Sequence, residues 1–319
     1  MKRRIPMKNI LSLLILIFLV SCNTNKNRNE TEGKDVYMFT SFREPATEGL
    51  RFLYSYDGYK WDSIPGVFLK PEAGTQKIMR DPSIAAGPDG TFHLVWTCGW
   101  KNDPAFGYAY SKDLINWSEQ QHIPIMAFDS TTVNVWAPEL FYDDENRDFV
   151  IVWASTIPFK FEKGIEAEDN NHRLYYTKTK DFRNFSKAGL LYDPGYSSID
   201  AVIVKRDTSD YVLVFKDNTR PERNIRAAFA KSATGPYDKP SEKFTDSFTE
   251  GPSVVKTGDE WLVYFDAYKK RSYGAVSTKD FKTFTGIDEK ISIPAGHKHG
   301  TIFKAKESIV YKLKSINHE

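Results

Sequence analysis

Five titratable residues recur at similar intervals along the 319-residue sequence and carry its strongest chemical signal. Each stands at the start of a short apolar run, and the intervals are 58, 61, 50 and 49 residues. They are Asp81, Glu139, Asp200, Glu250 and His299. One acid beside Pro or Gly is usually a turn residue, but turn residues need not keep a common spacing.

Four carboxylates and one imidazole that share a small space would perturb one another's pKa values. Repulsion raises the pKa of one carboxyl group, which can then act as a general acid, while another stays ionised as a base. Cleavage of a glycosidic bond requires this pair on opposite faces of a sugar, with a third negative group to keep the acid protonated. The pattern therefore predicts acid and base chemistry on a sugar.

A phrase that repeats five times predicts the elements that position these residues. It reads as a strand, a polar turn and an aromatic residue that opens the next strand. Its copies begin at Tyr54, Tyr108, Tyr175, Ala228 and Gly274, and the fourth copy is the loosest. Two apolar runs joined by turn residues precede each of the last four copies. Four strands per repeat, at a spacing of 46 to 67 residues, are typical of β-propeller blades.

We therefore predict an all-β fold, a single five-bladed β-propeller with four-stranded blades and very little helix. The first and second strands of four blades are expected at 83–86 and 91–97, 140–142 and 149–154, 202–205 and 211–215, and 254–256 and 261–265. The fifth blade combines an inner strand at 299–304 with strands at 36–40 and 51–56, which closes the ring. Inner strands line the axis of a propeller, so the five titratable residues should meet there.

The N-terminus has the pattern of an export signal. Residues 1–21 are first basic and then apolar, and the apolar run 10–20 is too short to span a membrane. The small residues before Cys22 resemble the processing box of bacterial lipoproteins, which implies acylation of Cys22 and attachment to the outer membrane, on its periplasmic or outer side. An ordinary cleaved signal is the alternative. Residues 22–34 are expected to form a flexible tether and 35–319 the catalytic propeller.

Composition excludes several other classes of protein. Cys98 is the only cysteine besides Cys22, so no internal disulfide is expected. Loss of residues 1–21 removes four bases and no acid, which leaves a net charge of about −2 and makes nucleic acid an unsuitable partner. We expect a monomer that contacts the membrane only through its N-terminal lipid.

The loops between second and third strands should open on the same face as the titratable residues. They are aromatic and polar, as sugar recognition requires. Packing between blades is the alternative role for each aromatic residue. The expected sugar-binding residues are Trp100, Trp136, Glu139, Arg220, Tyr268 and His299.

The ordered motifs resemble those of glycoside hydrolase family 43. They are Arg80-Asp81-Pro82-Ser83, Trp136-Ala137-Pro138-Glu139, Ile199-Asp200-Ala201, Glu250-Gly251-Pro252 and His299-Gly300. The resemblance runs from about residue 35 to the C-terminus and implies a propeller enzyme that removes arabinofuranosyl or xylosyl units with inversion of configuration.

By that resemblance, Asp81 is the general base, Glu250 the general acid, and Asp200 tunes and orients Glu250. Inversion leaves room for a water, with the two carboxyl groups about 6.5–9.5 Å apart. Many relatives hold a structural Ca²⁺ in the channel, and His299 occupies the matching position, where it would contact the ion through water.

Two other interpretations stay open. One is another five-bladed glycosidase family, acting on fructans or anhydrosugars, although the ordered acids argue against it. The other is a glycan-binding lipoprotein without catalysis. Such a protein would be free to lose the general acid, yet Asp81, Asp200 and Glu250 are all present. For the substrate, we expect terminal α-L-arabinofuranose first, β-xylose second and β-galactose third.

Overall fold

The computed structural model describes Met1 and residues 33–316 of the chain. The predicted signal peptide, Cys22 and most of the tether therefore lie outside the described residues. No helix in the described part of the chain is both long enough and apolar enough to cross a bilayer.

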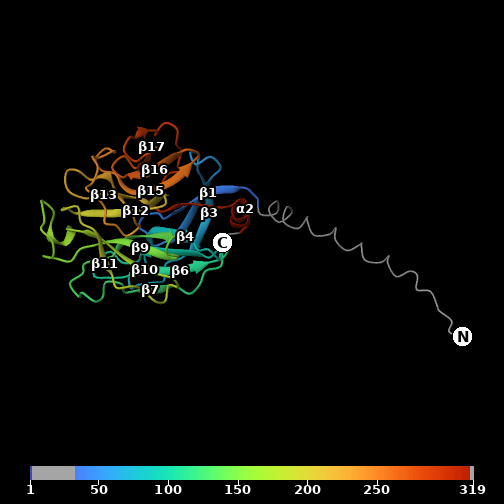
Figure 1. The fold of residues 1–319 in the computed structure, drawn as a ribbon, viewed down its shortest axis with the longest axis horizontal. Coiled ribbons are helices and arrows are strands. Elements are labelled where there is room, and N and C mark those ends of the chain that lie inside the picture. Colours follow the sequence, from blue (N-terminus) through green and yellow to red (C-terminus); the bar gives the residue numbers. More distant parts are fainter. Residues whose placement is uncertain (2–32, 317–319) are drawn as a thin grey trace.

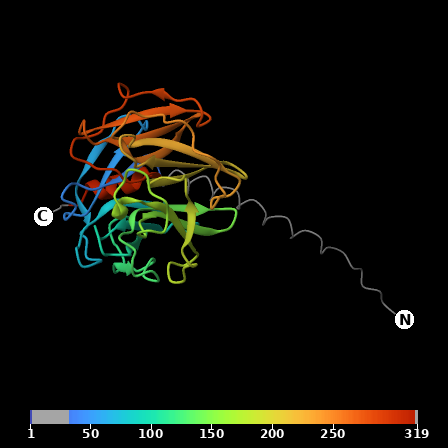
Figure 2. The same cartoon turned by 90° about the vertical axis from the view of Figure 1, so that its left-hand side faces the viewer.

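The described chain forms five antiparallel sheets around a common axis, which confirms the predicted five-bladed propeller (Figure 1). In Figure 2 the sheets follow one another around the molecule in sequence order, and the last sheet (orange) lies beside the first (blue). The strands of the first three blades are β1 (Asp35–Ser41), β2 (Leu50–Ser55) and β3 (Asp62–Leu69); β4 (Arg80–Ala86), β5 (Phe92–Thr97), β6 (Phe106–Ser111) and β7 (Gln121–Ile123); and β8 (Trp136–Asp143), β9 (Asp148–Ser155), β10 (Arg173–Thr179) and β11 (Gly189–Tyr192). The others are β12 (Ser198–Asp207), β13 (Asp210–Asp217) and β14 (Asn224–Ala230), and then β15 (Glu250–Thr257), β16 (Glu260–Ala267), β17 (Ser272–Thr278) and β18 (Thr285–Gly286).

The first blade is closed by the C-terminal strand β19 (Ile302–Lys306), as the sequence predicts. This strand pairs antiparallel with β1, from Asp35 opposite Lys306 to Phe39 opposite Ile302. Closure by both ends of the chain leaves no open gap between the first and last blades, and so protects strand edges that would otherwise pair with other chains.

The repeated phrase forms the same hydrogen-bonded turn in four blades. In the first blade, Ser55 Oγ accepts the backbone N–H of Gly58, while Asp57 Oδ1 accepts the N–H groups of Tyr59 and Lys60. A hydroxyl followed two residues later by Asp makes equivalent bonds at Ser111 and Asp113, Thr179 and Asp181, and Thr278 and Asp280. The side chains thus replace backbone partners and set up the outer strand.

The fourth blade has only three strands in the described structure, so the prediction of four-stranded blades is wrong there. Its copy of the phrase, from Ala230 onward, lacks the hydroxyl and Asp pair, and Pro236 and Pro240 cannot donate to a ladder. Isolated backbone bonds to Phe229, Ala227 and Ile225 along β14 take the place of an outer strand.

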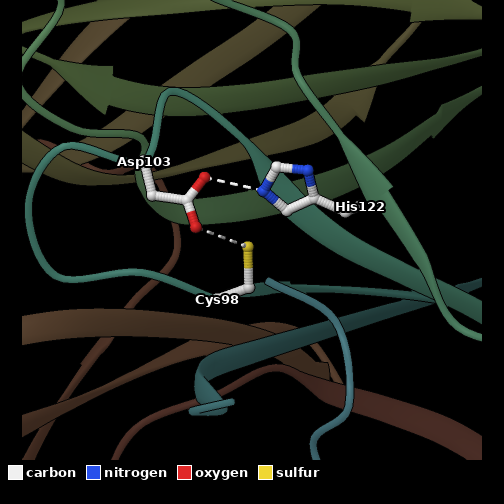
Figure 3. A group of neighbouring side chains, drawn as sticks. All are labelled: Cys98, Asp103 and His122. Atoms are coloured by element: carbon white, nitrogen blue, oxygen red, sulfur yellow. Dashed lines mark hydrogen bonds and ion pairs between the residues drawn. The ribbon is translucent and has the colours of Figure 1, made fainter. Parts of the chain in front are cut away.

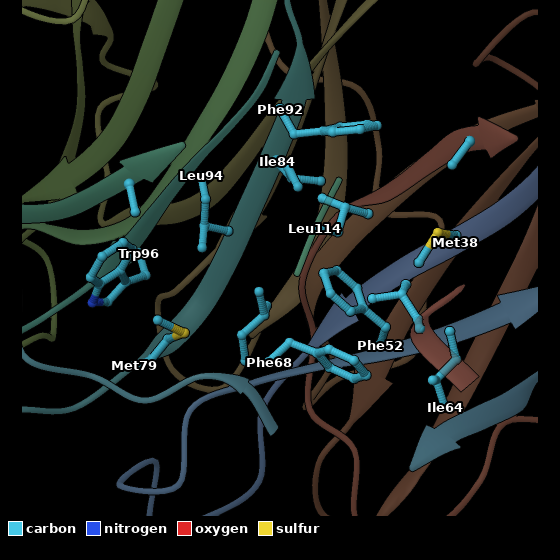
Figure 4. Close-up of a cluster of buried hydrophobic side chains, with 14 of the residues drawn as sticks. Met38, Phe52, Ile64, Phe68, Met79, Ile84, Phe92, Leu94, Trp96 and Leu114 are labelled. Carbon is cyan, nitrogen blue, oxygen red and sulfur yellow. The ribbon is translucent and has the colours of Figure 1, made fainter. Parts of the chain in front are cut away.

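Apolar side chains between neighbouring blades form the core. Figure 4 shows one such cluster between the first and second blades, where Phe52 and Phe68 lie with ring centroids 5.1 Å apart. Helix is scarce, as predicted: the described chain contains the 3₁₀ turn η1 (Glu168–Asn170) and the helix α2 (Glu307–Lys314), which buries Val310 and Leu313.

Candidate active site

In the second to fifth blades, the inner strand has an irregularity in its pairing close to its first residue. Regular pairing breaks between Arg80 and Ser83, Trp136 and Glu139, Ile199 and Val202, and Glu250 and Ser253. Within each break one residue has a positive φ: Asp81 at 51°, Ala137 at 45°, Asp200 at 53° and Gly251 at 57°. Such bulges re-aim side chains and are common beside active sites.

These bulges correct the alignment made from sequence. Asp81 and Asp200 occupy equivalent positions, but Glu250 stands one residue before its blade's positive-φ residue and Glu139 two residues after. The four acids are therefore not at one repeat position. They still reach the axis. Side chains along a strand point alternately to its two faces, and the extra residue of a bulge changes which of them point toward the axis.

The predicted gathering on the axis is present. Asp81, Glu139, Asp200 and His299 line one small cavity of about 20 Å³, which has room for about one water. A carboxylate oxygen of Glu250 lies within 4.8 Å of a ring nitrogen of His299. A sugar ring is too large for this cavity.

Asp81 is ionised and fixed by two partners. Its Oδ1 lies 2.9 Å from His299 Nε2, off the direction of a good hydrogen bond, and its Oδ2 accepts a hydrogen bond of 2.8 Å from Thr97. Burial opposes ionisation, but the nearby imidazolium of His299 more than compensates, so the pKa of Asp81 is lowered. Burial likewise opposes the charge on His299, yet the surrounding carboxylates, with Asp81 foremost, raise its pKa to about 9.

Glu250 is paired with a lysine that the sequence analysis missed. Lys216 on β13 is only 2% exposed, and its Nζ lies 2.8 Å from Glu250 Oε2. Burial raises the pKa of Glu250, but Lys216 and then His299 overcome this effect, so the pKa is lowered. The sequence does contain a signal for this lysine. Lys216 directly follows the apolar run 211–215, and a lysine that is buried with such a run requires a charged partner.

Asp200 lies between these groups and has a raised pKa. Burial is the main cause, and it outweighs the lowering by His299 and Lys216. Asp200 Oδ2 accepts the backbone N–H of Gly251 at 3.0 Å. Only glycine fits at that position, since an added Cβ would lie 2.0 Å from the His299 ring.

Glu139 lines the axial cavity and is held by a hydroxyl from the C-terminal segment. Thr301 Oγ1 donates to its carboxylate at 2.9 Å, and the same hydroxyl lies 2.9 Å from Ser83 Oγ. Burial raises the pKa of Glu139 to about 7. Its predicted role in sugar binding stays a prediction.

An aromatic wall stands beside Arg80, the residue before Asp81, whose Cζ lies 4.8 Å from the centre of the Trp100 ring. The rings of Trp100 and Trp136 lie with centroids 4.6 Å apart, and Trp136 lies 4.9 Å from the ring of His172. Trp136 Nε1 donates to the backbone oxygen of Trp100 at 2.8 Å, and Trp100 is 46% exposed. His172, which the sequence analysis missed, is buried with Nε2 unpartnered, and burial lowers its pKa to about 4.

Tyr268 lies on the loop between β16 and β17, and Arg220 lies on the loop between β13 and β14. Lys216 Nζ is 5.2 Å from the centre of the Tyr268 ring, so Tyr268 borders the Glu250 side of the site. Arg220 is exposed, and its backbone N–H is bonded to Glu166 of the insert 156–172.

The residues on the axis do not fit direct binding of Ca²⁺. Glu250, Asp266 and His299 each offer one donor atom within 4.8 Å of the others. However, Glu250 is paired with Lys216 and Asp266 with Lys298 at 2.9 Å. Two ammonium groups and an imidazole contrast with the six to eight oxygen ligands that calcium prefers.

Comparison with known proteins shows the family of the chain. A family model related to glycoside hydrolase family 43 and described as "Probable glycosyl hydrolase domain" matches residues 32–308. The chain belongs to this family. Membership implies a carbohydrate substrate and agrees with the carboxylates on the propeller axis.

Individual relatives are distant. An α-L-arabinofuranosidase of Bifidobacterium longum subsp. longum is 29% identical over 150 residues, which cover 40% of this chain and 14% of that enzyme. Solved structures with the same fold include the two that follow. One is an α-L-arabinanase of Cellvibrio cellulosa complexed with arabinohexaose, with a TM-score of 0.58 and 14% identity over 82% of this chain and 95% of that one. The other is an α-L-arabinofuranosidase of Podospora anserina, with a TM-score of 0.54 and 12% identity over 74% and 76%.

Proposed function

We propose that the chain is an inverting, exo-acting glycoside hydrolase that releases terminal pentose from plant-type polysaccharide or oligosaccharide. The observation that carries this proposal is the meeting of Asp81, Asp200 and Glu250 from three blades on one axis, beside exposed tryptophan. α-L-arabinofuranose is the preferred substrate, β-xylose the second and β-galactose the third. The similarity to an arabinofuranosidase supports this order.

In this mechanism Asp81 is the general base. Its lowered pKa keeps it ionised near neutral pH, so it can take a proton from a water that attacks the anomeric carbon. Glu250 is the general acid and protonates the leaving glycosidic oxygen from the opposite face. Asp200 lies close enough to Glu250 for the negative charge of Glu250 to raise the pKa of Asp200, and we assign it the role of orienting Glu250 and tuning its pKa.

Because of Lys216, Glu250 can act as the general acid only after substrate has bound. It lowers the pKa of Glu250 in the free chain, so Glu250 must gain a proton as sugar binds. A bound sugar excludes water from Glu250, and desolvation favours the neutral carboxyl group. The cavity on the axis holds only about one water, so the sugar lies above it, against Trp100 and Trp136.

Aryl glycosides test this function directly. The purified protein is assayed with nitrophenyl α-L-arabinofuranoside, β-xyloside and β-galactoside, beside the variant Glu250→Gln. We expect release of nitrophenol from at least one glycoside, fastest from the arabinofuranoside, and its loss in the folded variant. No turnover of any glycoside, together with retention on an arabinan or xylan affinity gel, would favour the glycan-binding alternative.

The lipid anchor is a separate part of the proposal. We propose that Cys22 is acylated and holds the enzyme at the bacterial outer membrane, because it follows a short export signal and small residues. Radioactive palmitate should label the parent chain in cells and not the variant Cys22→Ser. Equal labelling of both chains, or none in either, would contradict acylation at Cys22.

A further inference from the structure

Three side chains with metal-binding atoms meet at one end of the second blade, outside the axial carboxylates (Figure 3). Cys98 follows β5, Asp103 lies in the loop to β6, and His122 belongs to β7. One donor atom from each lies within 4.8 Å of the other two. Figure 3 shows the sulfur, the carboxylate and the ring nitrogen turned toward one another.

The surroundings of Asp103 are unusual for a buried carboxylate. Its side chain is 7% exposed, its Oδ1 lies 2.7 Å from His122 Nε2, and its Oδ2 lies 3.9 Å from Cys98 Sγ. Within residues 33–316, no lysine, arginine or backbone N–H is bonded to either oxygen. A buried carboxylate normally has a cation or several donors as partners. Here both neighbours are side chains that bind transition metals.

Two glycines provide the space around this carboxylate. A Cβ atom at Gly99 would lie 2.6 Å from Asp103 Oδ2, and one at Gly74 would lie 3.1 Å from the same oxygen. Either side chain would push the carboxylate away from Cys98. The chain therefore leaves Asp103 room to sit between a thiol and an imidazole.

We propose that Cys98, Asp103 and His122 bind one Zn²⁺ ion, with water as the fourth ligand. Tetrahedral zinc, with bonds of about 2.0–2.3 Å, keeps its donors about 3.3–3.7 Å apart, so the observed spacing needs small side-chain movements. Binding replaces the proton of the Cys98 thiol, which passes to solvent. The His122 side chain is 40% exposed, which gives the ion an entry path and leaves room for the water.

The thiolate and imidazole favour zinc over calcium or magnesium, which prefer oxygen ligands. The bound ion would tie the loop after β5 to the outer strand β7. That loop carries Trp100, whose backbone oxygen holds Trp136 Nε1. Zinc would thus brace the aromatic wall without touching the axial carboxylates.

Cobalt is a suitable probe because its bond to a thiolate absorbs light, whereas zinc is silent. The untagged protein, carrying Cys22→Ser so that Cys98 is its only cysteine, is titrated with Co²⁺ and then with Zn²⁺. We expect one Co²⁺ per chain, a thiolate-to-cobalt absorption band, and its loss when zinc displaces cobalt.

Variants assign the ligands. His122→Ala removes an exposed ligand and should weaken cobalt binding about 100-fold or more, whereas Gln121→Ala, the adjacent exposed residue on β7, should leave it unchanged. Cys98→Ser should abolish the absorption band. Zn²⁺ should also raise the Tm of the parent and not that of His122→Ala. No stoichiometric binding at micromolar cobalt, or equal binding by parent and His122→Ala, would overturn the proposal whatever the hydrolase activity.

Discussion

Lys216 Nζ lies 2.8 Å from Glu250 Oε2, and the lysine side chain is 2% exposed. The pair joins the second strand of the fourth blade to the first residue of the inner strand of the fifth. A fixed cation therefore touches the carboxyl group that we propose as the general acid. It lowers the pKa of Glu250, which limits the pH range over which this group carries a proton.

Replacement of this lysine should move one side of the pH profile. In a profile of kcat/KM, the acidic limb reports ionisation of the base Asp81 and the alkaline limb reports loss of the proton from Glu250. Lys216→Met removes the cation that lowers the pKa of Glu250, so the alkaline limb should move to higher pH while the acidic limb moves less. The measurement is kcat/KM from about pH 3 to 9, because the lowered pKa of Asp81 places the acidic limb below pH 4.

Lys205→Met provides the control, since Lys205 lies near the opposite end of β12 from Asp200, where it is paired with Glu145. Its profile should match that of the parent. Circular dichroism of Lys216→Met checks that the protein is folded, because loss of one partner leaves a carboxylate uncompensated. An unmoved alkaline limb in folded Lys216→Met would remove Glu250 as the group that controls this limb.

Asp81→Asn tests the proposed base. The amide keeps the size of the side chain and can still accept from Thr97, but it cannot take a proton from water. General base catalysis contributes about 10²–10⁴-fold, so kcat should fall by that factor with KM nearly unchanged. A fall of less than about tenfold would exclude Asp81 from the chemical step. Azide, a nucleophile that needs no base, should restore turnover in this variant.

The propeller was predictable because its signals are local and repeated. A hydroxyl with Asp two residues later forms the same turn at Ser55, Ser111, Thr179 and Thr278, and its absence after Ala230 explains the three-stranded blade. The meeting of the acids followed from the same repeat. Their exact positions in the repeat did not, because Glu250 stands one residue before, and Glu139 two residues after, the bulge position that Asp81 and Asp200 share.

Other features of the site depend on contacts between distant segments. Lys216 and Glu250 are 34 residues apart and lie on different blades, so no local pattern pairs them. His172 lies beside Trp136 at the end of the insert 156–172, and sequence periodicity does not fix the path of such a loop.

Trp100 provides a test of sugar stacking. It is 46% exposed and lies on the ring of Trp136, so removal of its side chain should cost binding more than stability. If stacking on this ring contributes about 1–2 kcal/mol to the free energy of sugar binding, KM should be about 5- to 30-fold higher in Trp100→Ala. Tyr311→Ala, an exposed aromatic residue on α2, is the matched control and should leave KM unchanged. Equal KM values for the parent and Trp100→Ala would place the sugar elsewhere.

Glu139 should make the fold less stable as pH rises. Burial raises its pKa from 4.5 to about 7 in the folded chain, so the folded state holds its proton more tightly than the unfolded state. Below pH 4.5 both states are protonated and the residue has no effect on the pH dependence. Between pH 4.5 and 7 only the unfolded state loses the proton, and the free energy of unfolding falls. The total loss is up to about 3 kcal/mol above pH 7.

Glu139→Gln removes this titration and keeps an oxygen that can accept from Thr301. Urea unfolding at pH 4 should give similar free energies for the parent and the variant, whereas at pH 8 the variant should be more stable by as much as about 3 kcal/mol. Glu145→Gln, at an exposed turn of the same blade, is the control. A variant that is less stable than the parent at pH 8 would mean that the ionised carboxylate is stabilised on the axis, by His299⁺ or by another cation, and that Glu139 does not oppose folding.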